Sequence, residues 1–563
     1  MPTISVEQNL IAKLLAQHKL DHDVEQIADE LPLLGTDIDR CDAQTLDIEI
    51  FPNRPDLLSG ETLTRAIRNF VHRQPAKPSI TTTKGKITLN VEPDLAEIRP
   101  VILGAVVRNV DYTSIGVSAD EFIKSLMDHQ EKLHFALGRG RKRASIGVHD
   151  LAKLAPPFTV KAVSGDTKFT PLAATEPMSI KEIMAEHPKG IEYAYLLSEF
   201  DRYPIILDAE NNVLSFPPII NGDHTTVTKE TKDFFIDVTG WDIRACESSL
   251  MLIALQLQEY GGIIETVEVT NCFGATNVYP NGSAVEHKLT IAAIQGLLGG
   301  KLTEEAISGA INRMGGKLVA SDDELITLEM PRWRFDILHP VDLVEDIAIG
   351  HGYEDLGHDI PRSPMTAKPR SDANLLRRVG NSMQGLGMMQ IQSLTLSNDD
   401  DQFNLVRWES VGEVTRITNP ITIDHTLLRQ YLLPGLLRLL STNRHHDLPQ
   451  SVYELGTVVR DHKNSTRLAF LVAERSGGFA AIRGRIQAFL RDMGANEYKI
   501  LPLPDNEGPW LSGRSAKVII NGKHVGCFGE IDPHIAELFE LNVPLNGAEF
   551  ALEEIAKVIP DPV

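Results

Sequence analysis

The segment PRWRFDILHPVDLVEDIAIGHGY carries four carboxylates within eleven residues, interspersed with apolar positions. Pro340 suits the first turn of a helix, where its missing N–H costs nothing. On that helix Asp342, Glu345 and Asp346 stand at i, i+3 and i+4 on one face, and we expect Asp336 to arrive from a preceding strand. Mg²⁺ prefers carboxylate oxygens, so the pattern indicates a divalent-cation site. The alternative is that the acids only complement the helix dipole, which does not explain a third and fourth acid on the same side.

A second group of charged residues has the opposite sign. The stretch ALGRGRKRAS places Arg139, Arg141, Lys142 and Arg143 within five positions of an otherwise acidic chain. Such runs are usually solvated faces, and the alternative is a set of contacts to nucleic-acid phosphates. His134 and His149 flank the run, and we interpret both as structural rather than catalytic. The neighbouring pair of histidines in TNRHHDLPQ has no third ligand at metal spacing, which favours a surface or interface role.

Size and composition limit what can position these groups. A chain of 563 residues is too long for one core, and three to five domains are expected. The net charge of −22 excludes a surface that attracts nucleic acid as a whole. The four cysteines are scattered without a Cys-x-x-Cys pair, which excludes a zinc ribbon and favours reduced thiols. No basic leader precedes an apolar run, and runs such as LTIAAIQGLLGG are too short to span a membrane, so we expect a soluble cytoplasmic protein.

Local patterns predict the elements around these groups. A helical pattern of apolar residues begins near Ile4 and continues to Leu15. The stretch YPIILDAENNVLSFPP predicts a hairpin, and KVIINGKHVGCFG predicts another, with Asn521-Gly522 in a type I′ turn. The stretches LTIAAIQGLLGG and LTEEAISGAINRMGG predict two helices joined at Gly299-Gly300. The proline-rich stretch DIPRSPMTAKPR (359–370) is the clearest predicted linker.

Seven stretches of the chain combine into a more specific pattern, and all occur in one order. They are EIFPNRPDLLSG (49–60), RASIGVHDL (143–151), VLSFPPIING (213–222), FFIDVTG (234–240), the acidic segment already quoted, NPITIDHTLLRQYLLPGLL (419–437) and GRSAKVIINGKHVGCFGEIDP (513–533). Together they resemble the signatures of the phenylalanyl-tRNA synthetase beta subunit family, in its archaeal and eukaryotic form. The stretch near 513 departs from the family pattern, with Trp510-Leu511-Ser512 in place of the usual His-Pro and Asp532 in place of a common His.

This resemblance implies a multidomain α+β fold. The expected domains are an N-terminal domain with a linker (1–85), a tRNA-editing domain (86–272), a metal-binding helix-turn-helix-like domain (273–358), and a catalytically inactive class II synthetase-like core, an antiparallel sheet with helices (359–563). The resemblance also implies an alpha-subunit partner in an (αβ)₂ heterotetramer, tRNA(Phe) as the nucleic-acid partner, and Mg²⁺ at the four acids. No Gly-x-Gly-x-Gly-x-Glu-Arg motif is present, so ATP and phenylalanine are expected to bind on the alpha subunit.

The resemblance further implies a second, hydrolytic activity in the middle domain. A pocket built for phenylalanine cannot strongly reject tyrosine, which adds only a hydroxyl, so fidelity calls for a site that hydrolyses Tyr-tRNA(Phe). Ser215, Asp237 and Thr239 match the family's motifs there as candidate catalytic residues, and the four basic residues become candidates for tRNA binding. The alternative for FIDVTG is an ordinary strand-end turn at Thr239-Gly240, capped by Asp237.

Two other functions compete with this one. The chain could be a non-catalytic scaffold that only holds the alpha subunit and tRNA. The two helices near residue 300 also suggest a helix-turn-helix nucleic-acid regulator. The second helix carries Arg313 as its only basic residue, which argues against binding in a DNA groove.

Overall fold

The computed structural model describes residues 2–300, 302–357 and 367–557. The chain divides into two compact units, residues 1–361 and 362–563, which are described separately. Most of the predicted linker 359–370 lies outside the described residues. Among the described helices, none combines the length and apolarity that a membrane span requires.

The first unit begins with a small α/β module. Its three-stranded sheet has the order β1-β3-β2 and is antiparallel throughout. Ile4 lies in a strand that ends at Glu7, so the predicted helix starting near Ile4 was wrong in its first turn, because an alternating strand pattern runs directly into a helical one. The elements are β1 (Thr3–Glu7), α1 (Gln8–Ala16), α2 (Val24–Glu30), β2 (Thr36–Cys41), β3 (Thr45–Ile50) and α3 (Gly60–Phe70).

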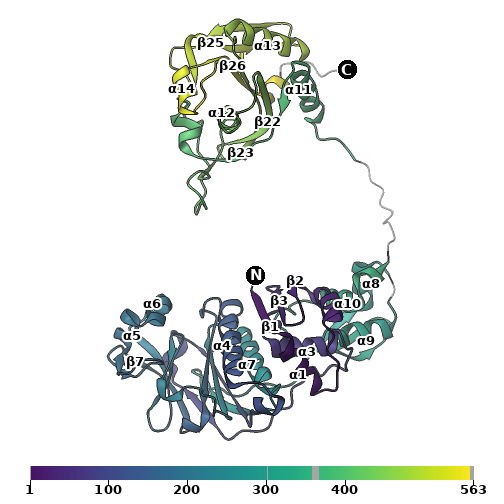
Figure 1. The fold of residues 1–563 in the computed structure, drawn as a ribbon, viewed down its shortest axis with the longest axis vertical. Coiled ribbons are helices and arrows are strands. Elements are labelled where there is room, and N and C mark those ends of the chain that lie inside the picture. Colours follow the sequence, from purple (N-terminus) through teal and green to yellow (C-terminus); the bar gives the residue numbers. More distant parts are fainter. Residues whose placement is uncertain (1, 301, 358–366, 558–563) are drawn as a thin grey trace. The chain divides into compact units, whose positions relative to one another are not determined.

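A large sheet forms the centre of the first unit (Figure 1). Its order is β12-β11-β10-β7-β4-β14-β5-β13-β6, with β15 paired to β14. The strands are β4 (Thr88–Val91), β5 (Val101–Arg108), β6 (Ala144–Asp150), β7 (Phe158–Ser164), β10 (Arg202–Leu207), β11 (Val213–Phe216), β12 (Ile220–Asn221), β13 (Phe234–Gly240), β14 (Ile263–Thr270) and β15 (Thr276–Tyr279). The hairpin predicted around the Asn-Asn pair is confirmed as β10 and β11.

Two apolar cores use the two sides of this sheet. Helices α4 (Ala119–Ala136) and α7 (Ile243–Gln258) pack with β5, β13 and β6 in a core that continues into the N-terminal module. The other core contains Phe158, Phe216 and Phe235, together with residues of α5 (Ile180–Glu186), which is followed by α6 (Pro188–Tyr193). A two-stranded sheet of β8 (Lys168–Phe169) and β9 (Met178–Ser179) precedes these short helices. Strands β5 and β13 therefore contribute side chains to both cores, and β6 extends the sheet beside β13.

The last part of the first unit is a three-stranded antiparallel sheet, β16-β18-β17, packed on three helices. The two predicted helices are confirmed, and Gly299 ends the first of them with a φ of 77°. Pro340 begins the third helix, as predicted. The elements are β16 (Val285–Thr290), α8 (Ile291–Leu298), α9 (Glu304–Arg313), β17 (Lys317–Ser321), β18 (Leu325–Met330) and α10 (Pro340–His351).

The second unit is built on a seven-stranded sheet of order β19-β22-β23-β27-β26-β25-β24. All neighbouring strands are antiparallel except β19 and β22. Two apolar clusters complete the unit. The strands are β19 (Met389–Gln390), β22 (Gln450–Arg460), β23 (Lys463–Ala473), β24 (Tyr498–Pro502), β25 (Trp510–Ile520), β26 (Lys523–Ile531) and β27 (Leu545–Ala551), with a separate pair, β20 (Leu396–Ser397) and β21 (Leu427–Leu428). The helices are α11 (Ala373–Gly385), α12 (Leu433–Thr442), α13 (Phe479–Asp492), α14 (Pro533–Leu538) and α15 (Leu552–Ala556).

Candidate functional site

Asp237 lies in the middle of β13, between β5 and β6. It is paired with Gly104 on one side and with Gly147 on the other, and its side chain is almost fully buried. The strand continues through Gly240, and Thr239 is paired on both sides. The alternative that made FIDVTG a strand-end turn is therefore wrong. Asp237 has a glycine opposite it on both neighbouring strands, which leaves its carboxylate free of flanking side chains.

His149 holds one oxygen of this carboxylate. Its Nε2 lies 2.7 Å from Oδ2 of Asp237, and its Nδ1 lies 2.8 Å from Oγ1 of Thr225. The Thr225 hydroxyl donates to the carbonyl of Gly222 at 3.0 Å, so Nδ1 is the donor in the His149–Thr225 contact. Among the described residues, the hydrogen bonds of Asp237 fall on Oδ2 and leave Oδ1 for another donor.

Gly147 explains why the carboxylate and the imidazole can meet. A Cβ at this position would lie 2.0 Å from Oδ2 of Asp237 and 2.7 Å from Nε2 of His149. Both distances are shorter than any van der Waals contact, so a larger residue would have to displace the pair. Gly147 and His149 are two residues apart on β6, so both face the same side of the sheet. The structural role predicted for His149 does not include this contact with Asp237, which no local sequence pattern indicates.

Thr239 is held by Arg99, a residue that the sequence did not single out. Arg99 donates from Nε to Oγ1 of Thr239 at 2.7 Å, and from Nη2 to the Thr239 carbonyl at 2.7 Å and to the Arg141 carbonyl at 3.0 Å. Arg99 is 2% exposed, and burial lowers its pKa to about 10. With this pKa the guanidinium stays protonated near neutral pH. Arg99 therefore links the Thr239 hydroxyl to the basic turn at Arg141. A lone arginine in IRPVILG gave no sequence signal for this role.

Ser215 belongs to a different part of the sheet. It lies on β11, and its hydroxyl donates to Oδ1 of Asn221 at 3.3 Å. In the strand order, five strands lie between β11 and β13. The segment that follows β11 returns toward β13, because the Ile219 carbonyl accepts from Arg141 and Thr225 contacts His149. The structure thus brings Asp237 and Thr239 together on one strand and connects Ser215 to them through this returning segment.

The four basic residues of the predicted tRNA contact divide into two pairs. Arg139 and Lys142 are exposed. Arg141 is buried and donates to Oε1 of Glu131 at 2.6 Å, and Arg143 forms an ion pair with Asp242. Successive φ angles of 50°, 63° and 65° at residues 139–141 turn the backbone so that the pairs face different surroundings. The exposed pair is thus the one available to a partner.

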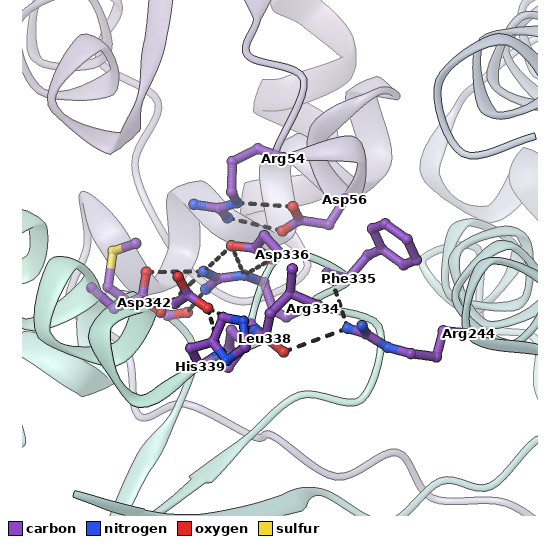
Figure 2. A network of polar contacts seen from close by, with 12 residues as sticks. Arg54, Asp56, Arg244, Arg334, Phe335, Asp336, Leu338, His339 and Asp342 are labelled. Carbon is purple, nitrogen blue, oxygen red and sulfur yellow. Dashed lines mark hydrogen bonds and ion pairs between the residues drawn. The ribbon is translucent and has the colours of Figure 1, made fainter. Parts of the chain in front are cut away.

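The four acids of the opening segment line one cavity of about 460 Å³. Asp336 lies in a turn after β18 and not in a strand, so that expectation was wrong. Figure 2 shows the Arg334 guanidinium against Asp336, with Asp342 turned to the backbone N–H groups of Leu338 and His339. Arg334 is two residues from Asp336 in the chain, yet it also reaches Asp346 on α10.

Arg334 binds two of the four carboxylates. Its Nη2 lies 2.6 Å from Oδ2 of Asp336 and 2.9 Å from Oδ1 of Asp346. Burial acts to raise the pKa of Asp336, but Arg334 outweighs it and holds that pKa below its usual value. The pKa of Asp346 is raised, first by burial and also by Asp336, although Arg334 opposes both. One guanidinium therefore neutralises the pair incompletely. Glu345 is exposed and adds a further negative charge at the cavity.

The chemistry of the four carboxylates suits a hard cation, but their positions do not form a coordination site. All four side chains that the sequence indicated offer carboxylate oxygens to one cavity, which suits Mg²⁺. Within the described ranges, however, no three His, Cys, Asp or Glu side chains are grouped closely enough to hold a metal. The reason is that Asp336 and Asp346 face Arg334, and one oxygen of Asp342 caps α10.

Comparisons with known proteins agree along almost the whole chain. Three family models match: the B3/4 domain (residues 104–255), the tRNA synthetase B5 domain (287–353) and the phenylalanyl tRNA synthetase beta chain CLM domain (357–552). The chain is 38% identical over 558 residues to a phenylalanine–tRNA ligase beta subunit of Methanosarcina acetivorans, covering 99% of each chain. It is 36% identical over 554 residues to that of Archaeoglobus fulgidus, covering 98% of each.

A solved structure matches the first unit. It is an N-terminal fragment of the phenylalanyl-tRNA synthetase beta subunit from Pyrococcus horikoshii, with 30% sequence identity and a TM-score of 0.57. The match covers 62% of this chain and all of that fragment.

Proposed function

The chain belongs to the family of phenylalanine–tRNA ligase beta subunits, and from this premise we propose that it joins an alpha subunit in an (αβ)₂ tetramer that charges tRNA(Phe), and that it hydrolyses mischarged Tyr-tRNA(Phe) at Asp237. A chain with this role works in the cytoplasm, with tRNA. The synthetic site and its ATP belong to the alpha subunit.

The observation that carries the editing proposal is the environment of Asp237. A hydrolytic site for Tyr-tRNA must favour tyrosine over phenylalanine, and the difference between them is one hydroxyl group. Asp237 offers a buried carboxylate between two glycines, with Oδ2 held by His149. Its Oδ1 can accept the tyrosine hydroxyl, whereas phenylalanine would leave it desolvated and unpaired. Such an unpaired buried group costs about 1–3 kcal/mol, a factor of about 5–150 in selectivity.

The other residues hold the ester and the tRNA end in place. The Thr239 hydroxyl accepts from Nε of Arg99 at 2.7 Å and can donate to a ligand, and Ser215 offers a second hydroxyl on β11, before the returning segment. A water molecule held at the Thr239 hydroxyl adds its oxygen to the ester carbonyl carbon, the bond to the ribose oxygen breaks, and a proton of the water passes to that oxygen, so that free tyrosine and uncharged tRNA are released. Arg139 and Lys142, which are exposed beside the Arg141 anchor, bind tRNA phosphates.

Magnesium is proposed at the acidic cavity, with Asp336, Asp342, Glu345 and Asp346 as ligands. The support is the common cavity of these four carboxylates and their incomplete neutralisation by Arg334. Bound there, the ion would supply positive charge that holds the turn after β18 against α10. No part of the hydrolytic reaction passes through it.

The test uses the reconstituted tetramer and pre-charged Tyr-tRNA(Phe). Asp237→Ala should leave Phe-tRNA synthesis nearly unchanged while deacylation of Tyr-tRNA falls. Equal deacylation rates in the wild type and the variant would remove Asp237 from the site. If the wild-type tetramer does not deacylate Tyr-tRNA, the editing function is excluded. The alternative is then the scaffold function, in which this chain only holds the alpha subunit and tRNA.

A further inference from the structure

A second cavity of the first unit, of about 420 Å³, has more cationic than anionic side chains in its lining. It lies where the N-terminal module, the end of α7 and the turn after β18 meet, and residues 74–81 in part close one side. Two anionic side chains, Asp56 and Glu259, line it. The six cationic residues are Arg54, Arg65, Arg68, Lys77, Arg313 and Arg334. In a chain with a net charge of −22, this is a local reversal of sign.

Three of the six cations already have carboxylate partners. Arg54 forms a two-point ion pair with Asp56, and Arg334 binds Asp336 and Asp346. Arg313 lies 3.2 Å from Glu30 and also donates to two backbone carbonyls. The other three cations decide whether the cavity has an excess of positive charge.

Of the remaining three cations, two share a single carboxylate and the third has none. Glu259 accepts from Nη1 of Arg65 at 3.0 Å and from Nη2 of Arg68 at 2.6 Å, both on the same oxygen. Lys77 is exposed and has no ion pair within the described part of the chain. Three positive charges therefore face one negative charge, and the two guanidiniums are largely buried, with 20% and 10% of their side chains exposed.

The basic groups around Glu259 act on one another. Burial is the first cause that lowers the pKa of His18, which contacts Arg68; Arg68 lowers it further, Glu259 opposes this, and Lys77 and Arg65 have smaller lowering effects. Burial also lowers the pKa of Arg65, where Glu259 opposes the change and Arg68 adds to it to a smaller extent. Nearby like charges lower the pKa of a basic group.

We infer that this cavity binds a small molecule through a phosphate dianion held by Arg65, Arg68 and Lys77. Arg65 and Arg68 share one carboxylate and Lys77 has no ion pair among the described residues, so all three can donate to phosphate oxygens, which arginine forks suit. The cavity volume lies in the range of small-ligand sites, about 300–1,000 Å³, and is larger than a phosphate group alone. Room therefore remains for an organic substituent beside Trp333, which lines the same cavity.

Calorimetric titration of the full-length chain with inorganic phosphate, at constant ionic strength, tests this site. We expect saturable binding that Lys77→Ala weakens about tenfold, equivalent to about 1.4 kcal/mol. Lys84→Ala is the matched control, because Lys84 is an exposed lysine of the same segment that does not line the cavity. Arg65→Gln should weaken binding at least as much. Because Lys77 has no ion-pair partner to lose, its substitution should leave the fold intact even if Arg65→Gln does not.

Two results would overturn the inference. One is the lack of saturable phosphate binding, and the other is an equal affinity of the wild type, Lys77→Ala and Lys84→Ala. A titration in excess tRNA identifies the source of the phosphate. Unchanged phosphate binding supports a small molecule, whereas displacement by tRNA would assign the cavity to the nucleic-acid backbone and overturn the small-molecule part. This test does not involve deacylation, so it stands independently of the editing proposal.

Discussion

Replacing Gly147 by alanine should slow editing strongly without replacing any proposed catalytic residue. Gly147 lies opposite Asp237 in the register of β6 and β13. A methyl group there would lie 2.0 Å from Oδ2 of Asp237 and 2.7 Å from Nε2 of His149. The backbone is held on both sides by the sheet, so the side chains must move instead. The carboxylate would have to shift by about 1 Å or more to reach ordinary contact distance, and its 2.7 Å hydrogen bond to His149 would be lost.

The expected loss follows from the strength of that hydrogen bond. A hydrogen bond to a charged group contributes about 1.5–3 kcal/mol, and each 1.4 kcal/mol is a factor of about ten. Deacylation of pre-charged Tyr-tRNA(Phe) by the tetramer should therefore fall about 10- to 150-fold in Gly147→Ala. Synthesis of Phe-tRNA, measured on the same preparation, should stay close to the wild-type rate because we propose that the alpha subunit performs it.

Gly104→Ala provides a matched control on the opposite neighbour of Asp237. Its Cβ would lie 3.3 Å from Phe235 and 3.4 Å from Val267, contacts that shifts of a few tenths of an ångström can relieve. Its deacylation rate should stay near that of the wild type. If Gly147→Ala does not fold, Asp237→Asn, which keeps the volume of the side chain, replaces it as the test variant in the deacylation assay. A folded Gly147→Ala tetramer that deacylates Tyr-tRNA at the wild-type rate would refute this account of the site.

Three further predictions concern other parts of the chain. Purified without an alpha subunit, the chain should show no phenylalanine-dependent ATP–pyrophosphate exchange, and sustained exchange would contradict the assignment of ATP to the partner. Replacing Asp342 and Asp346 by Asn should abolish bound magnesium, measured by elemental analysis, and unchanged metal content would leave these acids as helix-dipole partners. His134 and Arg141 lower the pKa of Glu131 to about 2, against the effect of burial. Relative to Glu131→Gln, the wild type should gain stability above pH 4.5 and lose this gain as the pH falls toward 2, measured by thermal unfolding; a constant difference across that range would refute the pairing.

Local turn chemistry made much of the fold predictable. Asn521 and Gly522 adopt φ angles of 46° and 79° between β25 and β26, as their residue types indicated. Gly299 ends α8 in the left-handed region for the same reason. The error at Ile4 arose because strand and helix follow each other without a turn residue, so apolar spacing alone could not locate the boundary.

The candidate site was less predictable, because its geometry depends on pairing between distant strands. Asp237 meets Gly104, Gly147 and His149, which lie about 90 to 130 residues earlier in the chain. No local pattern specifies which strands become neighbours or in which register. Family motifs could therefore indicate Asp237 and Thr239, but not the imidazole that orients one or the arginine that holds the other. Arg99 and His149 became visible only with the pairing of β5, β13 and β6.

Arg334 and Arg54 connect the acidic cavity to the cationic cavity. Both line the cationic cavity, and both lower the pKa of Asp336 in the acidic cavity. Magnesium bound at Asp336 and Asp346 would compete with Arg334 for their oxygens. The positive charge of Arg334 would then be less neutralised, and the ion would add its own charge nearby. Both effects raise the positive potential of the phosphate cavity, so magnesium should tighten phosphate binding.

Linkage makes this coupling reciprocal, and phosphate should tighten magnesium by the same factor. Titration of phosphate with and without magnesium measures the coupling. The variant with Asn at positions 342 and 346 controls for magnesium phosphate formed in solution, because magnesium should no longer affect its phosphate affinity. Equal phosphate affinities of the wild type in both conditions would show that the two cavities act independently. A fivefold to tenfold change would instead mean that Arg334 is shared between two ligands, which is a physical reason to place the carboxylates of Asp336 and Asp346 against one arginine.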